Sequence, residues 1–220
     1  MVEVYEALLR RMGGLCTAPA SISWHTQEMK IAKEPCDVSS LQVVREALRA
    51  AHFAAKKHSN QRRKGLAAEP YINHLIEVAE LVSMALTEPD AEVIVGAFLH
   101  DTIEDTKTTR EELVEHFGSD VADLVAEVTD DKSLLKAERK RLQVETAPTK
   151  SARAQAIKLA DKISNMRRIL FSPPADWDLQ RKKEYFAWAK RVVDGFTAPN
   201  LILKAEFDRT YARFSEISSR

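Results

Sequence analysis

Two acidic side chains follow a histidine and an aspartate at the end of an apolar run. The run covers residues 93–99, His100 and Asp101 come directly after it, and Glu104 and Asp105 lie one helical turn further on. Because side chains four apart share a helix face, a continuous helix places the second pair over the first. An imidazole beside a carboxylate binds divalent metals well, and two further acids can move protons. The stretch predicts a metal site; an N-terminal cap and a solvated acidic turn are the alternative.

A metal shell needs more ligands than this pair, and two further residues have suitable side chains. His74 opens a helical pattern directly after Asn73, and Asp161 lies in a largely apolar setting. Burying a lone carboxylate is costly, so Asp161 needs a cation or a hydrogen-bond partner. On spacing alone we favour a structural salt bridge to a nearby lysine for Asp161.

Other histidines compete with His74 for the ligand role. His52 falls beside the apolar stripe of its helix, which indicates a hydrogen-bonded core histidine. His58 lies at a helix C-terminus, where partial positive charge is favourable. We expect His116 on the surface of an amphipathic helix.

The elements that must position these residues are helices. Apolar residues recur at helical spacing over most of the chain from residue 39 onward, while sustained period-two alternation and Asn-Gly or Asp-Gly turns are missing. We therefore expect one all-α domain over residues 39–220. The expected helical segments are the one from residue 39, 74–86, the stretch with the acidic pairs, 109–117, 120–128, 134–146, 151–170, 178–196 and 199–217.

Residues 1–38 differ from the rest of the chain. Glycine, proline and serine interrupt them, and their apolar periodicity is weak. We expect a loosely ordered N-terminal extension, with one short helix at residues 2–12.

Composition excludes several classes of protein. Charge balances at 33 basic and 33 acidic residues, which gives no global field to attract nucleic acid or an anionic membrane. Two cysteines exclude a disulfide framework and a cysteine-based zinc site. No apolar run approaches a membrane span, and the sequence starts without a signal-peptide pattern. We expect a soluble, cytoplasmic protein with neither nucleic acid nor membrane as a partner.

The order of the candidate residues resembles the HD-domain phosphohydrolases, and more closely the hydrolase domain of the RelA/SpoT homologue family. The matching motifs are Gln61–Lys64, Pro70–His74, Leu99–Thr106, Phe117–Gly118, Val128–Lys132 and Lys158–Lys162. The resemblance runs from Leu41 to Phe196, and the stretches 130–132 and 184–189 point to the small stand-alone hydrolases, the Mesh-type branch. It implies an HD-domain helical bundle of roughly eight to ten helices, in line with the periodicity. No room remains for the family's nucleotide-synthesising domain or its regulatory half, so synthesis of the alarmone is not expected.

The resemblance also implies roles for the residues of the site. The implied ligands of one divalent metal ion, Mn2+ in the family, are His74, His100, Asp101 and Asp161. Two nitrogens and two carboxylate oxygens suit manganese, iron, zinc or nickel by their chemistry alone. Glu104 and Asp105 match the catalytic acidic pair of the family.

A basic pair matches the family's nucleotide site. The guanidinium of Arg63 can stack on a purine, and the ammonium of Lys64 can meet a phosphate. The alternative for this pair is a solvated loop. Residues 65–69 make a longer spacer before Pro70 than many bifunctional relatives have, and Leu75 stands where proline is common in the family.

Four weaker candidates complete the implied nucleotide site. Asn165 lies one turn after Asp161 and is placed to hydrogen-bond base or ribose, with a polar surface residue as the alternative. Lys132, Tyr185 and Arg181 are candidates for phosphate or ribose contacts. A charged helix surface explains Lys132 and Arg181 equally well, and core packing explains Tyr185.

The function implied by the resemblance is hydrolysis of guanosine 3′,5′-bis(diphosphate), and of the pentaphosphate form, at the 3′ position. Pyrophosphate leaves, and GDP or GTP remains. One alternative is an HD-type phosphohydrolase acting on another nucleotide, such as NADPH. Another is a catalytically inactive nucleotide-sensing module, which is expected to lack a metal ligand or the acidic pair. All the matching positions are intact here. The expected partner is a small guanosine nucleotide, and no oligomeric state is implied.

Overall fold

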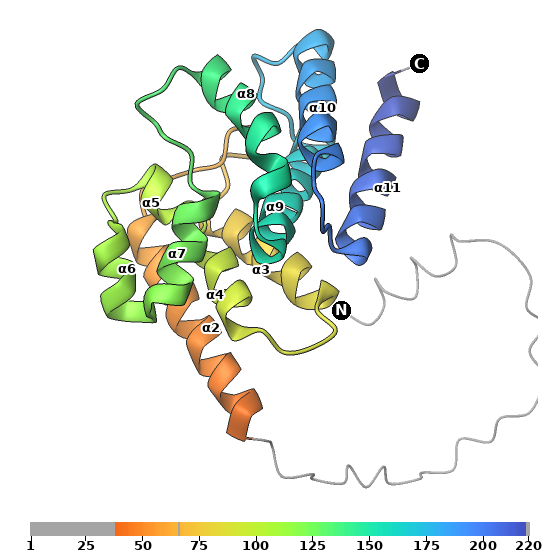
Figure 1. Ribbon diagram of the computed structural model, residues 1–220. Helices are drawn as coiled ribbons and strands as arrows, with labels where there is room; N and C mark the ends of the chain where they lie inside the picture. Colours follow the sequence, from red (N-terminus) through yellow and green to blue (C-terminus); the bar gives the residue numbers. More distant parts are fainter. Residues whose placement is uncertain (1–37, 66, 219–220) are drawn as a thin grey trace, which may run out of the picture. The chain divides into compact units, whose positions relative to one another are not determined.

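The computed structural model describes residues 38–65 and 67–218, which form a helical bundle (Figure 1). Within these ranges there are ten α-helices and one short 3₁₀ helix. The only strand-like pairing among the described residues is an isolated bridge between Arg62 and Pro70. The all-α prediction is therefore confirmed. The predicted N-terminal extension and its short helix lie outside the described residues, apart from residue 38.

Most helices follow one another with short connections, but the one between α2 and α3 is longer and covers residues 58–71. In chain order they are α2 (Val38–Lys57), α3 (Ile72–Ala85), α4 (Ala91–Leu99), α5 (Thr102–Asp105), α6 (Arg110–Phe117), α7 (Ser119–Val128), α8 (Lys136–Thr146), η1 (Ala147–Thr149), α9 (Ala152–Phe171), α10 (Leu179–Asp194) and α11 (Leu201–Ser218). Thr109 accepts a hydrogen bond from the Glu112 N–H at 3.2 Å and so caps α6. Gly118 separates α6 from α7 with a φ of 86°, a left-handed conformation that favours glycine.

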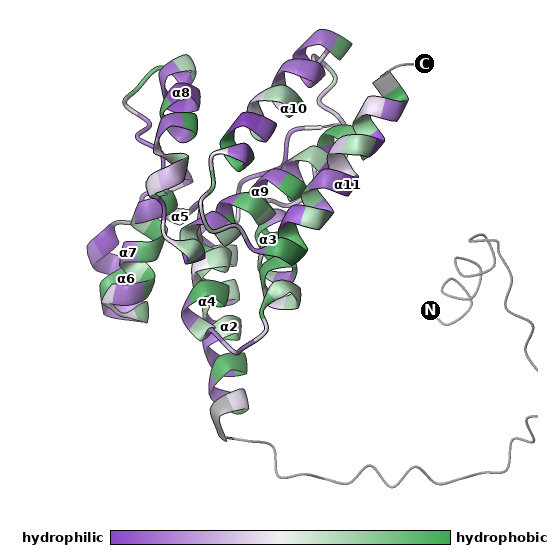
Figure 2. Cartoon of the chain, turned by 45° about the vertical axis from the view of Figure 1, so that its right-hand side comes forward, coloured by the Kyte–Doolittle hydropathy of each residue, from purple (hydrophilic) through white to green (hydrophobic). Residues whose placement is uncertain are grey.

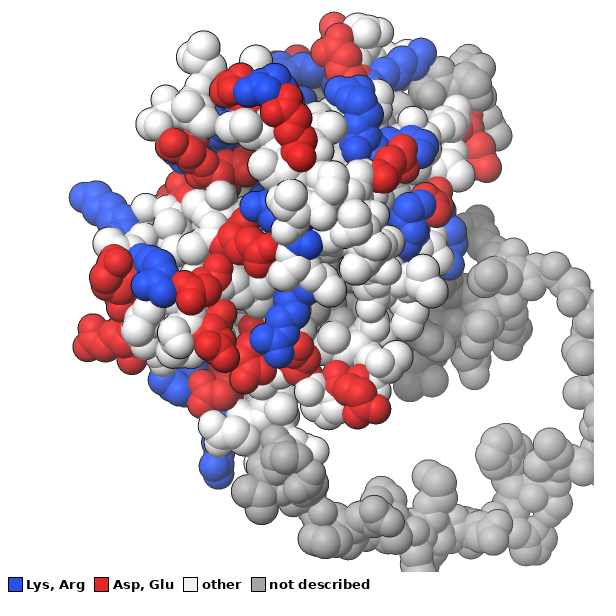
Figure 3. All heavy atoms as spheres, viewed as in Figure 1, with Lys and Arg blue, Asp and Glu red and all other residues white. Residues whose placement is uncertain are grey.

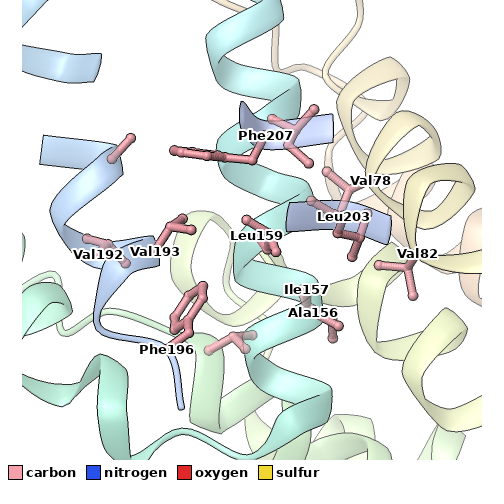
Figure 4. Packing of buried hydrophobic residues seen from close by; sticks show 14 of the residues in the cluster. Val78, Val82, Ala156, Ile157, Leu159, Val192, Val193, Phe196, Leu203 and Phe207 are labelled. Atoms are coloured by element: carbon pink, nitrogen blue, oxygen red, sulfur yellow. The ribbon is translucent and has the colours of Figure 1, made fainter. Parts of the chain in front are cut away.

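Helix α9 runs through the centre of the bundle and contacts α3, α4, α7, α10 and α11. Its side chains Ile157, Leu159 and Ile163 are fully buried. Figure 4 shows the first two among apolar side chains of α3, α10 and α11. Each buried side chain of this size contributes about 1.5–3 kcal/mol. A second apolar cluster, centred on Leu75 and Leu99, joins α2, α3, α4, α6 and α7.

The distribution of charge on the surface agrees with the equal numbers of basic and acidic residues in the sequence. Figure 3 shows basic and acidic side chains interspersed over the visible face, with no single-sign field. In Figure 2, hydrophobic colour is frequent on α3 and α4, whereas α8 is largely hydrophilic. None of the helices in the described ranges combines the length and the apolar character that crossing a bilayer requires.

The predicted continuous helix through the two acidic pairs is wrong. Helix α4 ends at Leu99, Asp101 has φ and ψ of −101° and 0°, and α5 begins at Thr102. The Thr102 hydroxyl donates to the Leu99 carbonyl at 2.6 Å, a local bond that competes with the helical pattern. The Asp105 N–H still donates to the Asp101 carbonyl at 2.8 Å. The two aspartates therefore keep their one-turn spacing, although the helix breaks before them.

Replacing Leu203 by alanine is expected to lower the free energy of unfolding by about 3 kcal/mol, because a buried leucine leaves both lost contacts and a cavity. Leu203 is 2% exposed and faces the α9 core (Figure 4). Leu201 lies on the same helix but is 80% exposed, so Leu201→Ala is the matched control, with a change below about 0.5 kcal/mol. Urea unfolding followed by circular dichroism measures both. Equal losses would contradict the observed burial of this α11 face.

Candidate functional site

Four side chains from three parts of the chain converge. His74 lies in the first turn of α3, His100 and Asp101 lie at the break between α4 and α5, and Asp161 lies in the middle of α9. His74 Nε2 is 3.6 Å from Asp101 Oδ2 and 3.4 Å from Asp161 Oδ1. His100 Nε2 is 3.2 Å from Asp101 Oδ2 and 4.0 Å from Asp161 Oδ1. Ligand atoms at about 2.1 Å from one ion lie about 3–4 Å apart, so these separations fit a shared metal ion.

The second ring nitrogen of each histidine fixes the orientation of the first. His74 Nδ1 lies 2.9 Å from Ser164 Oγ, and His100 Nδ1 donates to the Ala97 carbonyl at 2.8 Å. Both Nε2 atoms consequently face the carboxylates. His100 Nε2 is buried without a hydrogen-bond partner. An orphaned, buried nitrogen beside two carboxylates is a donor that a divalent ion would satisfy.

Charge in the cluster is balanced between acids and bases. Burial acts to lower the pKa of His100, but the Asp101 and Asp161 carboxylates outweigh it and raise that pKa to about 9. Burial acts to raise the pKa of the Asp101 and Asp161 carboxyls, but nearby positive charge outweighs it. His100 holds the pKa of Asp101 well below its usual range, and Lys162 does the same for the pKa of Asp161. The pocket therefore favours positive charge, which a divalent cation also supplies.

One carboxylate oxygen of Asp161 forms the ion pair that the sequence predicted, and the other oxygen faces the two histidines. Lys162 Nζ lies 3.0 Å from Oδ2, while Oδ1 faces the histidines and accepts a hydrogen bond from Asn165 Nδ2 at 2.6 Å. Lys162 is only 3% exposed, and its ammonium lies 4.7 Å from the centroid of the Trp188 ring. The salt bridge and a metal-ligand role are compatible, because they use different oxygens.

The acidic pair lies beside the cluster. Glu104 Oε2 accepts a hydrogen bond from the Asp130 N–H at 3.1 Å, and its Oε1 lies 3.6 Å from both Lys132 Nζ and Arg139 Nη1. Burial, then the Asp101 and Asp130 charges, raise the pKa of Glu104. A half-buried carboxyl with a raised pKa can accept and return a proton.

Asp105 and Asp101 are linked by a tyrosine. The Tyr71 hydroxyl donates to Asp101 Oδ2 at 2.6 Å and lies 3.3 Å from Asp105 Oδ2. Asp105 also pairs with Lys132. Burial and the neighbouring carboxylates raise the pKa of Tyr71, so it stays a donor. Tyr71 lies in the Pro70–His74 motif, and its position there is the signal that sequence reasoning left unused.

A cleft of about 800 Å³ opens over the acidic pair and His74. Ten cationic side chains line it, against four acidic ones, and this excess of positive charge suits a polyphosphate ligand. The six predicted nucleotide-binding residues all line this cleft: Arg63, Lys64, Lys132, Asn165, Arg181 and Tyr185. The structure thus brings them together, and their individual contacts with a nucleotide stay a prediction.

Two expectations about basic residues differ from what the structure shows. Arg63 is 9% exposed and donates to Asn165 Oδ1 at 3.2 Å, so a solvated loop does not describe it. Lys136, Arg139 and Lys140 of α8 also line the cleft, although sequence reasoning did not select them. Their i, i+3, i+4 spacing puts them on one helix face, which is the signal that could have found them.

The competing histidines have other roles. His52 is exposed, so the prediction of a core histidine is wrong. His58 is 2% exposed, and burial lowers its pKa, which contradicts a charged residue at the helix end. Its Nδ1 lies 2.7 Å from Gln61 Oε1, and its ring stacks on Tyr71 at 5.0 Å. His116 is exposed, as predicted.

The chain is similar to HD-domain proteins in both sequence and structure. The HD domain family model matches residues 50–186. A Xenopus tropicalis protein named guanosine-3′,5′-bis(diphosphate) 3′-pyrophosphohydrolase MESH1 is 50% identical over 164 residues, which cover 74% of this chain and 92% of the relative. The Homo sapiens protein of the same name is 50% identical over 155 residues, 70% of this chain and 87% of the relative. A solved structure of a metazoan SpoT orthologue that hydrolyses ppGpp matches with a TM-score of 0.73 and 43% identity, covering 76% of this chain and 94% of the other.

Replacing Asp161 by alanine is expected to abolish metal binding, because it removes an oxygen that faces both histidines and unbalances Lys162. Elemental analysis of purified protein dialysed against Mn2+ measures the bound ion, and circular dichroism verifies the helical fold. Asp176→Ala is the matched control, since that side chain is 73% exposed and pairs only with Arg181 among the described residues. Full occupancy in Asp161→Ala protein would remove Asp161 from the ligand set.

Proposed function

The chain belongs to the HD-domain family, in the branch of the MESH1 proteins, and on this premise we propose that it hydrolyses guanosine 3′,5′-bis(diphosphate) at the 3′ position. Pyrophosphate leaves and GDP remains; the pentaphosphate form gives GTP. The observation that carries the proposal is the meeting of a buried histidine–aspartate cluster, an acidic pair and a cationic cleft at one place. A nucleoside carrying two diphosphate groups complements that excess of positive charge.

We assign one divalent metal ion, Mn2+, to the histidine–aspartate cluster. Its ligands are His74, His100, Asp101 and Asp161. The mixed nitrogen and oxygen donor set and the orphaned His100 Nε2 support this assignment. When bound, the ion supplies a more acidic water and polarises the attacked phosphoryl group.

The acidic pair manages protons in this proposal. Water adds to the phosphorus at the 3′ position, the bond to the ribose 3′ oxygen breaks, and that oxygen gains a proton. Glu104 is suited to accept the proton of the water and return it to the ribose, because its pKa is raised. Asp105, held by Tyr71 and Lys132, orients the water. Nearby cations such as Arg139 stabilise the charge that develops on phosphate oxygens.

The nucleotide is held by the cleft wall. The Arg63 guanidinium donates to Asn165 and lines the cleft, where it can stack on a purine. Lys64, Lys132 and Arg181 supply charge for the phosphates. Tyr185 lies 5.8 Å from Trp177 between ring centroids and offers an aromatic wall for base or ribose. We further propose that the protein works in the cytoplasm, with this nucleotide as its partner.

Glu104→Ala is expected to lower kcat by about 100-fold or more, because a positioned acid–base group contributes at least that much. Bound metal should stay near the wild-type level, since Glu104 is outside the ligand set. A pyrophosphate-release assay with Mn2+ and elemental analysis measure the two quantities. Glu80→Ala, an exposed acid on α3, is the control and should keep full activity. Loss of metal together with turnover would assign Glu104 to the metal shell instead.

The substrate is tested by product analysis. We expect pyrophosphate and GDP from guanosine 3′,5′-bis(diphosphate), and slower turnover of NADPH measured as orthophosphate release, because the cleft cations match a nucleotide with two diphosphates. Faster release from NADPH would favour the alternative nucleotide. Binding of the alarmone without turnover in the presence of Mn2+ would favour an inactive sensing module.

A further inference from the structure

A partly buried hydrogen-bond chain leads away from His74, one of the proposed metal ligands. His74 Nδ1 lies 2.9 Å from Ser164 Oγ, and the Ser164 hydroxyl donates to Glu77 Oε2 at 2.6 Å. A carboxylate can only accept, so the single hydroxyl proton of Ser164 points to Glu77. His74 Nδ1 must then carry the proton that it donates to Ser164. The chain therefore fixes the tautomer in which Nε2 has a free lone pair toward the metal site.

The carboxylate at the end of this chain is shared with a residue of the nucleotide site. Glu77 Oε2 lies 3.5 Å from Arg63 Nη1, and Oε1 accepts from Arg167 Nη1 at 3.3 Å. Arg63 in turn donates to Asn165 Oδ1, and Asn165 Nδ2 donates to Asp161 Oδ1. These contacts therefore connect His74 to Asp161, both of them proposed metal ligands, through Ser164, Glu77, Arg63 and Asn165.

We propose that Ser164 and Glu77 are positioning residues of the metal centre and that Arg63 is tied to the same centre through Glu77. The inference rests on the proposed function, because it requires His74 to bind the ion. A negative carboxylate behind the histidine makes Nε2 a better donor and holds the ring in place. Neither Ser164 nor Glu77 is among the described residues that line the cleft, so the proposal has them act through His74.

The test measures Mn2+ affinity by calorimetry on the full chain, without nucleotide. Ser164→Ala is expected to weaken binding by about 10-fold or more, the usual effect of losing a partner of a metal-bound histidine. Glu77→Ala should weaken it similarly, and Glu77→Gln less, because the amide oxygen still accepts the Ser164 proton. Arg63→Gln should also change it, because Glu77 Oε2 and Asn165 Oδ1 both lose their guanidinium partner. An unchanged Mn2+ affinity would overturn the link between Arg63 and the metal centre.

Two substitutions on α3 serve as matched controls. Ser83→Ala removes a hydroxyl that donates only to the Glu80 carbonyl among the described residues, and Glu80→Gln neutralises an exposed acid. Both should bind Mn2+ like the wild type. The visible absorption of the Co2+-loaded protein is a second readout, and its band positions should shift in Ser164→Ala protein but not in the controls.

His74→Ala separates the possible failures. If His74→Ala binds Mn2+ like the wild type, the ligand assignment fails, and the proposed metal site with it. If His74→Ala loses the ion while the Ser164 and Glu77 variants bind normally, only the positioning inference is overturned. Should Ser164→Ala not fold, the Glu77→Ala and Glu77→Gln pair decides, since the Glu77 side chain is 26% exposed and Glu77→Gln keeps its shape.

Discussion

The main constraint on this structure is that the Asp101 and Asp161 carboxylates are both largely buried in the same cluster. A buried charge is costly unless a cation or hydrogen-bond donors compensate it. Asp161 pairs with Lys162 and accepts a hydrogen bond from Asn165, and Asp101 accepts one from the Tyr71 hydroxyl. Lys162 and Asn165 lie on α9 with Asp161 itself, whereas Tyr71 directly precedes α3 and reaches Asp101 from a different part of the chain. The remaining negative charge then becomes useful, because it favours a divalent ion.

Charge is arranged in layers around this cluster. The deep layer consists of the two histidines and two aspartates of the cluster, whereas the cleft above it is lined mainly by cations that suit phosphate. The connection between α7 and α8 joins the two layers. Asp130 donates its N–H to Glu104, and its own carboxylate accepts from Gln143 at 2.5 Å and lies 3.7 Å from Lys158. The loop whose backbone N–H bonds Glu104 is thus anchored to both α8 and α9.

The fold class could be predicted because helical periodicity is a local mark of the sequence. The adjacent histidine and aspartate after an apolar run favoured a metal site at His100 and Asp101. His74 and Asp161 joined the predicted ligand set only through the family resemblance, since spacing alone favoured a salt bridge for Asp161. The break before Asp101 left no such mark, because Asp101 and Asp105 keep their one-turn spacing across it and the Thr102–Leu99 hydrogen bond is seen only in the structure. The Ser164–Glu77 contact joins residues 87 positions apart, so no local pattern could predict it. The burial of Arg63 could not be predicted either, because its partners Glu77 and Asn165 lie on α3 and α9, far from it in sequence.

The aromatic wall of the cleft has an optical consequence. Of the three tryptophans in the sequence, Trp177 and Trp188 line the cleft. The ammonium groups of Lys140 and Lys162 each lie 4.7 Å from the centroid of the Trp188 ring, and the Arg181 guanidinium lies 4.7 Å from that of Trp177. Indole emission responds to nearby charge, and a bound polyphosphate draws these cations toward itself. The protein therefore carries its own fluorescent reporter of cleft occupancy, which needs no added dye.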